Sequence, residues 1–262
     1  MFFQKIIIIF FIFFIVCFDS FAKDKTDMVL IPSGSYIPLF KYGDDVLDDE
    51  SIDVDSFYID KYPVTNIDFY SFVKKKPEWD GNNFKLIFAD RNYLNHWKNI
   101  DSFDEINNYP VVNVSWFAAN EYCLYLGSRL PTLDEWEYVA SSGKEFRVAK
   151  DDPSYLHNLL DWYINSQSRG VISIDKMTDN YWGVFGLHGV VWEWVSDFNS
   201  VILLNTDAEG GGLEEVLYCG ATATNAVDPA DYAAFMRFAF RNSLEADYTI
   251  NTLGFRCVKN IK

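Results

Sequence analysis

The sequence predicts an α+β fold with few helices, short strands and much irregular chain. Three segments carry helix-start signals, and four short apolar runs suit strands. Over residues 146–179 the apolar residues show no clear helix or strand periodicity. The chain has 262 residues and an aromatic content of 18%. It can therefore bury a sizeable core even where the backbone is irregular, because each buried ring removes a large apolar area from water.

Each expected helix follows a serine or threonine that can cap its first turn. Thr132 and Glu135 have the spacing of a capping box, and Gly127 is placed to end the middle helix. The helices are expected from Asn66 to about Lys76, from Trp116 to Leu126, and from Thr132 to about Ser141.

Four short runs favour strands, because they are apolar and bounded by turn residues. They are Met28–Ile31, Ser56–Ile59, Val190–Trp194 and Gly254–Val258.

The formal net charge is −16. Nucleic acid and anionic membrane surfaces are poor partners for such a field, so we expect no nucleic-acid binding. The simplest role of the charge is solubility.

The N-terminus resembles an export signal. Lys5 precedes an unbroken apolar run over Ile6–Phe18, and Ser20 and Ala22 supply small residues at −3 and −1 of a cleavage site. We expect residues 1–22 to be a signal peptide and 23–262 a single domain, periplasmic or secreted, with no further membrane insertion. Two alternatives are a lipid-modified Cys17 and an uncleaved anchor.

Several ordered segments together resemble the formylglycine-generating-enzyme (sulfatase-modifying-factor) family. They run from near the start of the mature chain to its last strand. The segments are Met28–Tyr36, Phe57–Asn66, Tyr109–Trp116, Arg129–Tyr138, Asn180–Trp194 and Asn251–Cys257. The resemblance implies the fold of that family, whose core is related to C-type lectins.

The family's oxidase chemistry implies a pair of cysteines that bind copper(I) as thiolates, upstream of the closing strand. The chain has four cysteines, and Cys219 is the only one in that region. Ala221 stands where the family usually has serine. Formylglycine oxidase activity is therefore not expected, and we assign no catalytic residue. Cys219 is interpreted as a small buried hydrophobe, with a metal or redox role as the alternative.

The resemblance also implies a disulfide between Cys123 and Cys257, which correspond to cysteines bonded in vertebrate members. The bond would close a loop of about 134 residues and contribute about 4 to 5 kcal/mol on a chain-entropy model. Two buried free thiols are the alternative.

Calcium is the better metal candidate among those that the resemblance implies. Gly189 and Val191 would offer carbonyl oxygens and Glu193 a carboxylate, but the family's asparagine ligand falls on Gly186. The alternative is that Glu193 caps a turn or pairs with an arginine. We expect no copper or iron, because the three histidines are widely spaced and form no ligand motif.

The family's substrate groove corresponds here to Trp192, Tyr232, Arg237 and Arg241, which would suit an extended peptide. The alternative is that Trp192 belongs to the core and both arginines form internal salt bridges.

These observations favour an exported, non-catalytic binding or accessory protein with a protein or peptide partner in the cell envelope. The alternative is a diverged oxidoreductase that acts on a peptide or small molecule without the cysteine pair.

Overall fold

A computed structural model of the chain describes residues 28–37, 51–98, 100–149, 152, 154–155, 157, 159–160, 170–199 and 229–261, with the backbone alone over 229–235. In these ranges the fold is α+β, as the sequence predicts, with short strands and long irregular connections. Cys17, Cys219 and Ala221 lie outside the described residues.

The described strands form one three-stranded and two two-stranded sheets. The largest sheet is antiparallel, with the order β1-β4-β7, made of Met28–Ile31, Phe57–Asp60 and Val258–Asn260. The strands β2 and β3 pair antiparallel over Gly34–Tyr36 and Ile52–Val54. The strands β5 and β6 pair in parallel over Trp192–Glu193 and Leu253–Gly254.

One face of the β1-β4-β7 sheet packs on the core. Ile59 lies opposite Val29 on one side and Val258 on the other. Ile31 and Ile59 are fully buried, whereas Leu30 and Tyr58 face outward. This alternation is what a pleated strand with one buried face requires.

The four long helices of the described chain are α1 (Asn66–Lys75), α2 (Trp116–Tyr125), α3 (Leu133–Ala140) and α8 (Pro229–Asn242). The three predicted helices are confirmed, and so are their caps. Thr65 accepts from the backbone N–H of Asp68, and Ser115 accepts from that of Ala118. Thr132 and Glu135 form the capping box. Short 3-10 turns occupy Pro77–Trp79, Asn95–Trp97, Phe103–Glu105 and Ile174–Lys176.

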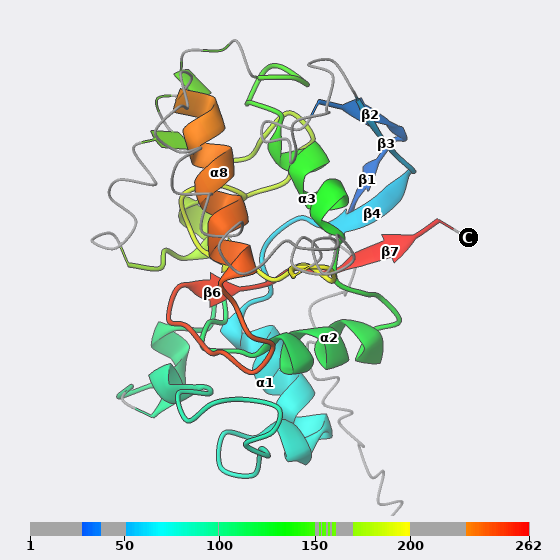
Figure 1. Ribbon diagram of the computed structural model, residues 1–262. Helices are drawn as coiled ribbons and strands as arrows, with labels where there is room; N and C mark the ends of the chain where they lie inside the picture. The colour runs from blue at the N-terminus through cyan, green and yellow to red at the C-terminus, as the bar shows by residue number, and fades with distance from the viewer. Residues whose placement is uncertain are drawn as a thin grey trace, which may run out of the picture.

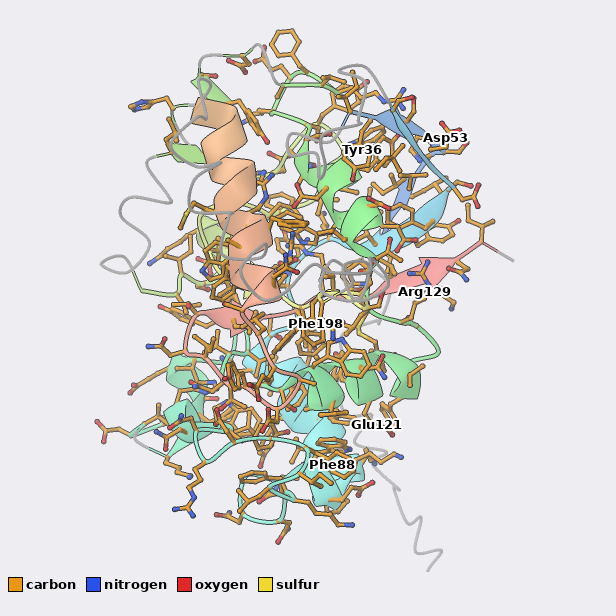
Figure 2. The ribbon with its side chains drawn as sticks, viewed as in Figure 1. Tyr36, Asp53, Phe88, Glu121, Arg129 and Phe198 are labelled. Carbon is orange, nitrogen blue, oxygen red and sulfur yellow. A yellow bond between two sulfur atoms is a disulfide. The ribbon has the colours of Figure 1, made fainter. Side chains whose placement is uncertain are left out.

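Two pairs of helices lie at opposite ends of the molecule (Figure 1). The pair α1 and α2 meets through aromatic rings, with Phe69 stacked on Tyr122 and both rings in contact with Phe255. The pair α3 and α8 lies at the other end, with α3 beside the β1–β4 strands and α8 on the opposite side of α3. Figure 2 places Phe88 and Glu121 at the α1–α2 end and Tyr36 and Asp53 at the α3 end.

Some sequence predictions need correction. The predicted strand over Val190–Trp194 shrinks to β5, and the one over Gly254–Val258 is split between β6 and β7. Helix α8 was not expected at all. Its start at Pro229 is compatible with a helix, because proline at the first helical position loses no intrahelical hydrogen bond.

Candidate functional site

Helix α3 positions the polar side chains at the centre of the molecule. Its first turn is fixed by the capping box and by Asp197, whose carboxylate accepts from the backbone N–H of Leu133 at 2.7 Å. Arg129 holds Glu135 through two bonds of 2.6 Å each. A helix start anchored in this way holds Trp136 and Glu137, on the following turn, in defined positions.

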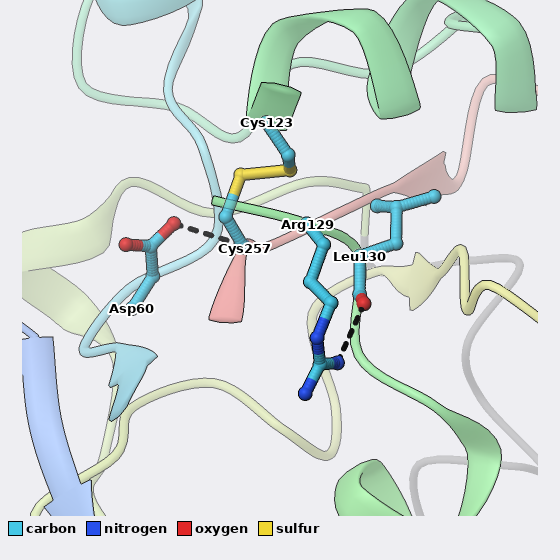
Figure 3. Close-up of a disulfide and its surroundings, with 5 residues drawn as sticks. All are labelled: Asp60, Cys123, Arg129, Leu130 and Cys257. Carbon is cyan, nitrogen blue, oxygen red and sulfur yellow. Dashed lines mark hydrogen bonds between the residues drawn. A yellow bond between two sulfur atoms is a disulfide. The ribbon is translucent and has the colours of Figure 1, made fainter. Parts of the chain in front are cut away.

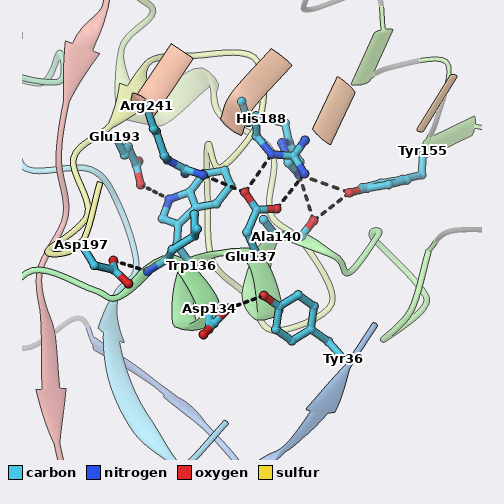
Figure 4. Close-up of polar contacts among 12 residues, drawn as sticks. Tyr36, Asp134, Trp136, Glu137, Ala140, Tyr155, His188, Glu193, Asp197 and Arg241 are labelled. Atoms are coloured by element: carbon cyan, nitrogen blue, oxygen red, sulfur yellow. Dashed lines mark hydrogen bonds and ion pairs between the residues drawn. The ribbon is translucent and has the colours of Figure 1, made fainter. Parts of the chain in front are cut away.

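Glu137 lies between two arginines of α8 (Figure 4). Arg237 donates to both carboxylate oxygens, from Nε at 3.0 Å and from Nη2 at 2.7 Å. Arg241 donates from Nη1 at 2.8 Å. Burial alone would raise the pKa of Glu137, but the two guanidinium groups outweigh it and lower the pKa to about 2. We call these three residues the Glu137 centre.

The Glu137 centre carries one more positive than negative charge. Both arginine side chains are almost fully buried, with 2% and 5% of their surface exposed. The guanidinium of Arg241 lies 4.4 Å from the ring centre of Trp136, and its Nε has no partner among the described residues. The aromatic face therefore helps to hold the second cation.

A second ion pair joins Glu193 of β5 to Arg256, and both side chains are fully buried. Arg256 donates to the two carboxylate oxygens over 2.7 to 3.0 Å, and Trp136 Nε1 adds a bond of 2.7 Å. Arg256 also donates to the backbone carbonyls of Asp60 and Phe185. We call Glu193, Arg256 and Asp60 the Arg256 centre.

The Arg256 centre involves Glu193, the one carboxylate of the predicted calcium site. Both oxygens of Glu193 already accept from a guanidinium or an indole, and a guanidinium occupies the position that a cation would need. Gly189 and Val191, whose carbonyl oxygens were the other predicted ligands, lie on the loop before β5. Glu193 therefore has the arginine partner that was the alternative to calcium, and calcium binding at this loop stays a prediction.

Asp60 completes the Arg256 centre and lies beside the disulfide (Figure 3). Its carboxylate accepts from the backbone N–H of Cys257 at 2.9 Å. Burial raises its pKa to about 7, and the nearby Arg256 only partly offsets this effect. Cys257 is bonded to Cys123 with an S–S distance of 2.01 Å and a Cα–Cα distance of 5.6 Å. The bond ties α2 to the chain just before β7.

The predicted peptide groove is not present in the described residues. Arg237 and Arg241 point inward to Glu137, and Trp192 stacks on Phe240 with ring centres 4.1 Å apart. These are the internal roles that the sequence allowed as the alternative. Tyr232 falls in the part of α8 where only the backbone is described. Arg237 and Arg241 therefore serve an internal ion pair, because an unpaired buried arginine would be costly.

His188 lies beside the Glu137 centre without joining it. Its Nε2 is 2.9 Å from the carbonyl oxygen of Ala140 and 3.4 Å from the hydroxyl of Tyr155. Burial, together with the charge of Arg237, lowers the pKa of His188 to about 4, so the ring is neutral at pH 7. A carbonyl can only accept, so Nε2 carries the hydrogen and Nδ1 is left as an acceptor.

The sequence analysis missed the roles of Glu137 and Asp60. One signal for Glu137 was available, because Arg237 and Arg241 are four residues apart and so share a helix face. No local signal marks Asp60, whose burial depends on strands distant in sequence. Across the described ranges, no helix combines the length and the apolar character that crossing a membrane requires.

The chain matches the family model described as a sulfatase-modifying factor enzyme 1-like domain over residues 17–261. It is 28% identical to the formylglycine-generating enzyme of Mus musculus, over 88% of this chain and 74% of that protein. It is 27% identical to the inactive C-alpha-formylglycine-generating enzyme 2 of Mus musculus, over 91% and 87% of the two chains. Among solved structures it is similar to CarF, with a TM-score of 0.52, 15% identity, and coverage of 90% and 98%. This structural likeness concerns the fold alone.

Proposed function

This chain belongs to the family of sulfatase-modifying factor enzyme 1-like domains, and we propose that it is an exported, non-catalytic member that binds a protein or peptide partner in the cell envelope. The observation that carries the proposal is the number of cysteines. The chain has four, at positions 17, 123, 219 and 257. Two of them are joined as Cys123–Cys257.

The remaining two cysteines are a poor copper site. Cys17 lies in the expected signal peptide, so the mature domain would keep Cys219 alone. Copper(I) prefers soft thiolate ligands, and a pair of them is what the family's oxidase chemistry implies. A chain that cannot supply this pair has no evident way to hold the copper.

The ionisable groups at the centre of the domain support a structural role. Glu137 is held by two arginines and Glu193 by one, so neither carboxylate is available as a base or ligand. The kinship with an inactive formylglycine-generating enzyme 2 is consistent with a member that has no catalysis.

Metal analysis tests the non-catalytic part of the proposal. The protein is purified after expression in copper- and iron-supplemented medium and measured by plasma mass spectrometry. We expect substoichiometric copper and iron. One equivalent of either metal per chain, retained after chelator dialysis, would instead favour the diverged oxidoreductase.

Export is tested separately. N-terminal sequencing of the protein recovered from outside the cytoplasm should give Lys23 as the first residue, because Ser20 and Ala22 mark the cleavage site. An intact Met1 in the membrane fraction would show an uncleaved anchor, and a blocked Cys17 would show lipid modification.

A further inference from the structure

A cavity of about 700 Å³ lies between the segment that follows α3 and the segment that leads to β5. Residues 142–146 of the first segment line it, as do residues 176–180 and 186–190 of the second, together with Tyr155 and Leu159. The volume is in the range of small-molecule sites. No residue of the Glu137 centre or the Arg256 centre lines the cavity, so it is separate from the buried ion pairs.

Charged side chains of both signs line the cavity. Lys144 and Glu145 belong to the segment after α3, and Lys176 and Asp179 to the segment before β5. Asp152 adds a third carboxylate, which is hydrogen-bonded within its own turn. Each of the two segments therefore presents one positive and one negative group to the same space.

Four of these charges are not neutralised by a partner within the described part of the chain. Lys144, Glu145, Lys176 and Asp179 form no salt bridge there. A ligand with a single charge would meet attraction from some of these groups and repulsion from the others. A molecule with one positive and one negative group can pair with both kinds, and such complementarity is what gives a charged site its specificity.

Apolar side chains also line the cavity. Phe146 is 55% exposed, and Ile172 is half-buried. Met177 and Val190 lie deeper, with 7% and 8% of their surface exposed. An aliphatic side chain on the ligand would remove part of this surface from water. The lining therefore suits a ligand that combines an apolar body with two opposite charges.

We propose that this cavity binds a small zwitterion with an aliphatic side chain, of about the size of a dipeptide. The amino group of the ligand pairs with Glu145 and Asp179, and its carboxylate pairs with Lys144 and Lys176. Its aliphatic side chains pack on the apolar lining, Phe146 included. The site goes beyond the partner binding proposed above, because its ligand is a small molecule with free ends and not a segment of a protein.

A set of related dipeptides tests each part of this chemistry. Leucyl-leucine carries both charges, its N-acetyl form lacks the positive one, its amide lacks the negative one, and glycylglycine lacks the side chains. Binding is followed by NMR of the methyl groups of Met177, Leu187 and Val190, which line the cavity. We expect saturable shifts with leucyl-leucine and none with glycylglycine. Each blocked form should bind about fivefold more weakly, as the loss of one partly exposed ion pair implies.

The two lysines allow the preference for a carboxylate to be reversed. Both are exposed, so their replacement leaves the core untouched. In the variant that combines Lys144→Glu with Lys176→Glu, leucyl-leucine amide should bind more tightly than the free dipeptide. The matched control combines Lys75→Glu with Lys85→Glu, which makes the same change of charge at exposed positions outside the cavity. The control should keep the order of affinities of the wild-type protein.

Maltose, an uncharged molecule of similar size, completes the set and should cause no saturable shift of these methyl groups. Four results would overturn the proposal: no saturable shift with leucyl-leucine, equal affinity for its free and blocked forms, an unchanged order in the cavity variant, or maltose shifts as large as those of leucyl-leucine. Should the cavity variant fail to fold, the blocked dipeptides and maltose on the wild-type protein still decide the question.

Discussion

The two ion-pair centres lie on either side of Trp136, yet they are built differently. At the Arg256 centre the carboxylate of Glu193 faces one guanidinium, and neither side chain is exposed. At the Glu137 centre one carboxylate faces two guanidinium groups, and the carboxylate side chain is 18% exposed. Trp136 donates its indole N–H to the first centre and presents its ring to the second.

The two centres therefore differ in which elements they join and in how their charges are balanced. The Arg256 centre joins β5 and the segment before β7, and both carboxylate oxygens of Glu193 accept hydrogen bonds. The Glu137 centre holds α8 against α3 and keeps an excess positive charge. We therefore expect the first centre to support the whole fold, and the second to tolerate change.

The largest effect is expected from Glu193→Gln, which keeps the shape but removes the charge opposite Arg256. Removing one partner of a buried ion pair typically costs about 3 to 5 kcal/mol, because the other charge stays buried and unpaired. Urea denaturation should show that the free energy of unfolding falls by this amount. The control is Glu121→Gln in the partly exposed pair with Lys76, where less than about 1 kcal/mol is expected. Equal losses in the two variants would contradict the comparison.

Asp60 gives the Arg256 centre a pH dependence of its own. Its pKa is about 7 in the folded protein, against about 3.9 in an unfolded chain. The folded state thus binds this proton more tightly, and its contribution to stability is present below about pH 4 and lost as the pH rises to about 7. Three pKa units correspond to about 4 kcal/mol.

The measurement is the free energy of unfolding of wild type minus that of Asp60→Asn, from pH 4 to 7. Subtraction matters because the lowered pKa values of His96 and His188 act in the opposite direction over the same interval. The difference should fall as the pH rises. A difference that is constant with pH would show that Asp60 is ionised as in water.

Glu137→Gln should cost less than Glu193→Gln, about 2 to 3 kcal/mol, because the carboxylate of Glu137 is partly exposed. The contribution of Glu137 to the free energy of unfolding changes with pH in the opposite direction to that of Asp60. The pKa of Glu137 is lowered to about 2, so its contribution is present above about pH 4.5 and is lost as the pH falls toward 2. Acid unfolding monitored by near-UV circular dichroism should show this loss for wild type but not for the variant.

Arg241→Met should have the smallest effect, within about 1 kcal/mol. The methionine can still pack on Trp136, and the remaining Arg237–Glu137 pair becomes one-to-one. The stability of this variant is compared with that of Arg256→Met by thermal unfolding, and Arg256→Met is expected to lose several times more stability. A loss in Arg241→Met as large as that in Arg256→Met would mean that the second cation is required for the fold.

The sequence was sufficient for those parts of the fold that depend on neighbouring residues. The caps at Thr65, Ser115 and Thr132 follow from hydrogen bonds within one helical turn, and these were predicted correctly. The short strands β5 and β6 were less well placed, because each is fixed by pairing with a partner distant in sequence.

The site was harder to predict, since it depends on which polar groups become buried together. Glu193 was assigned to calcium by resemblance, although its pairing with an arginine was weighed. Arg237 and Arg241 were placed in a groove because helix α8 was not foreseen, and without that helix their four-residue spacing could not be interpreted as one shared face toward Glu137.

The claim that this member of the family is non-catalytic can be tested by one assay. Purified protein with its disulfide intact is incubated with copper(I), oxygen and a synthetic peptide that carries a sulfatase-type cysteine motif, and the peptide is followed by mass spectrometry. The account predicts that the cysteine stays unmodified, because Cys123 and Cys257 are bonded to each other and the other two cysteines, Cys17 and Cys219, lie far apart in the sequence. Copper-dependent conversion of the cysteine to formylglycine, with more than one turnover per chain, would contradict it.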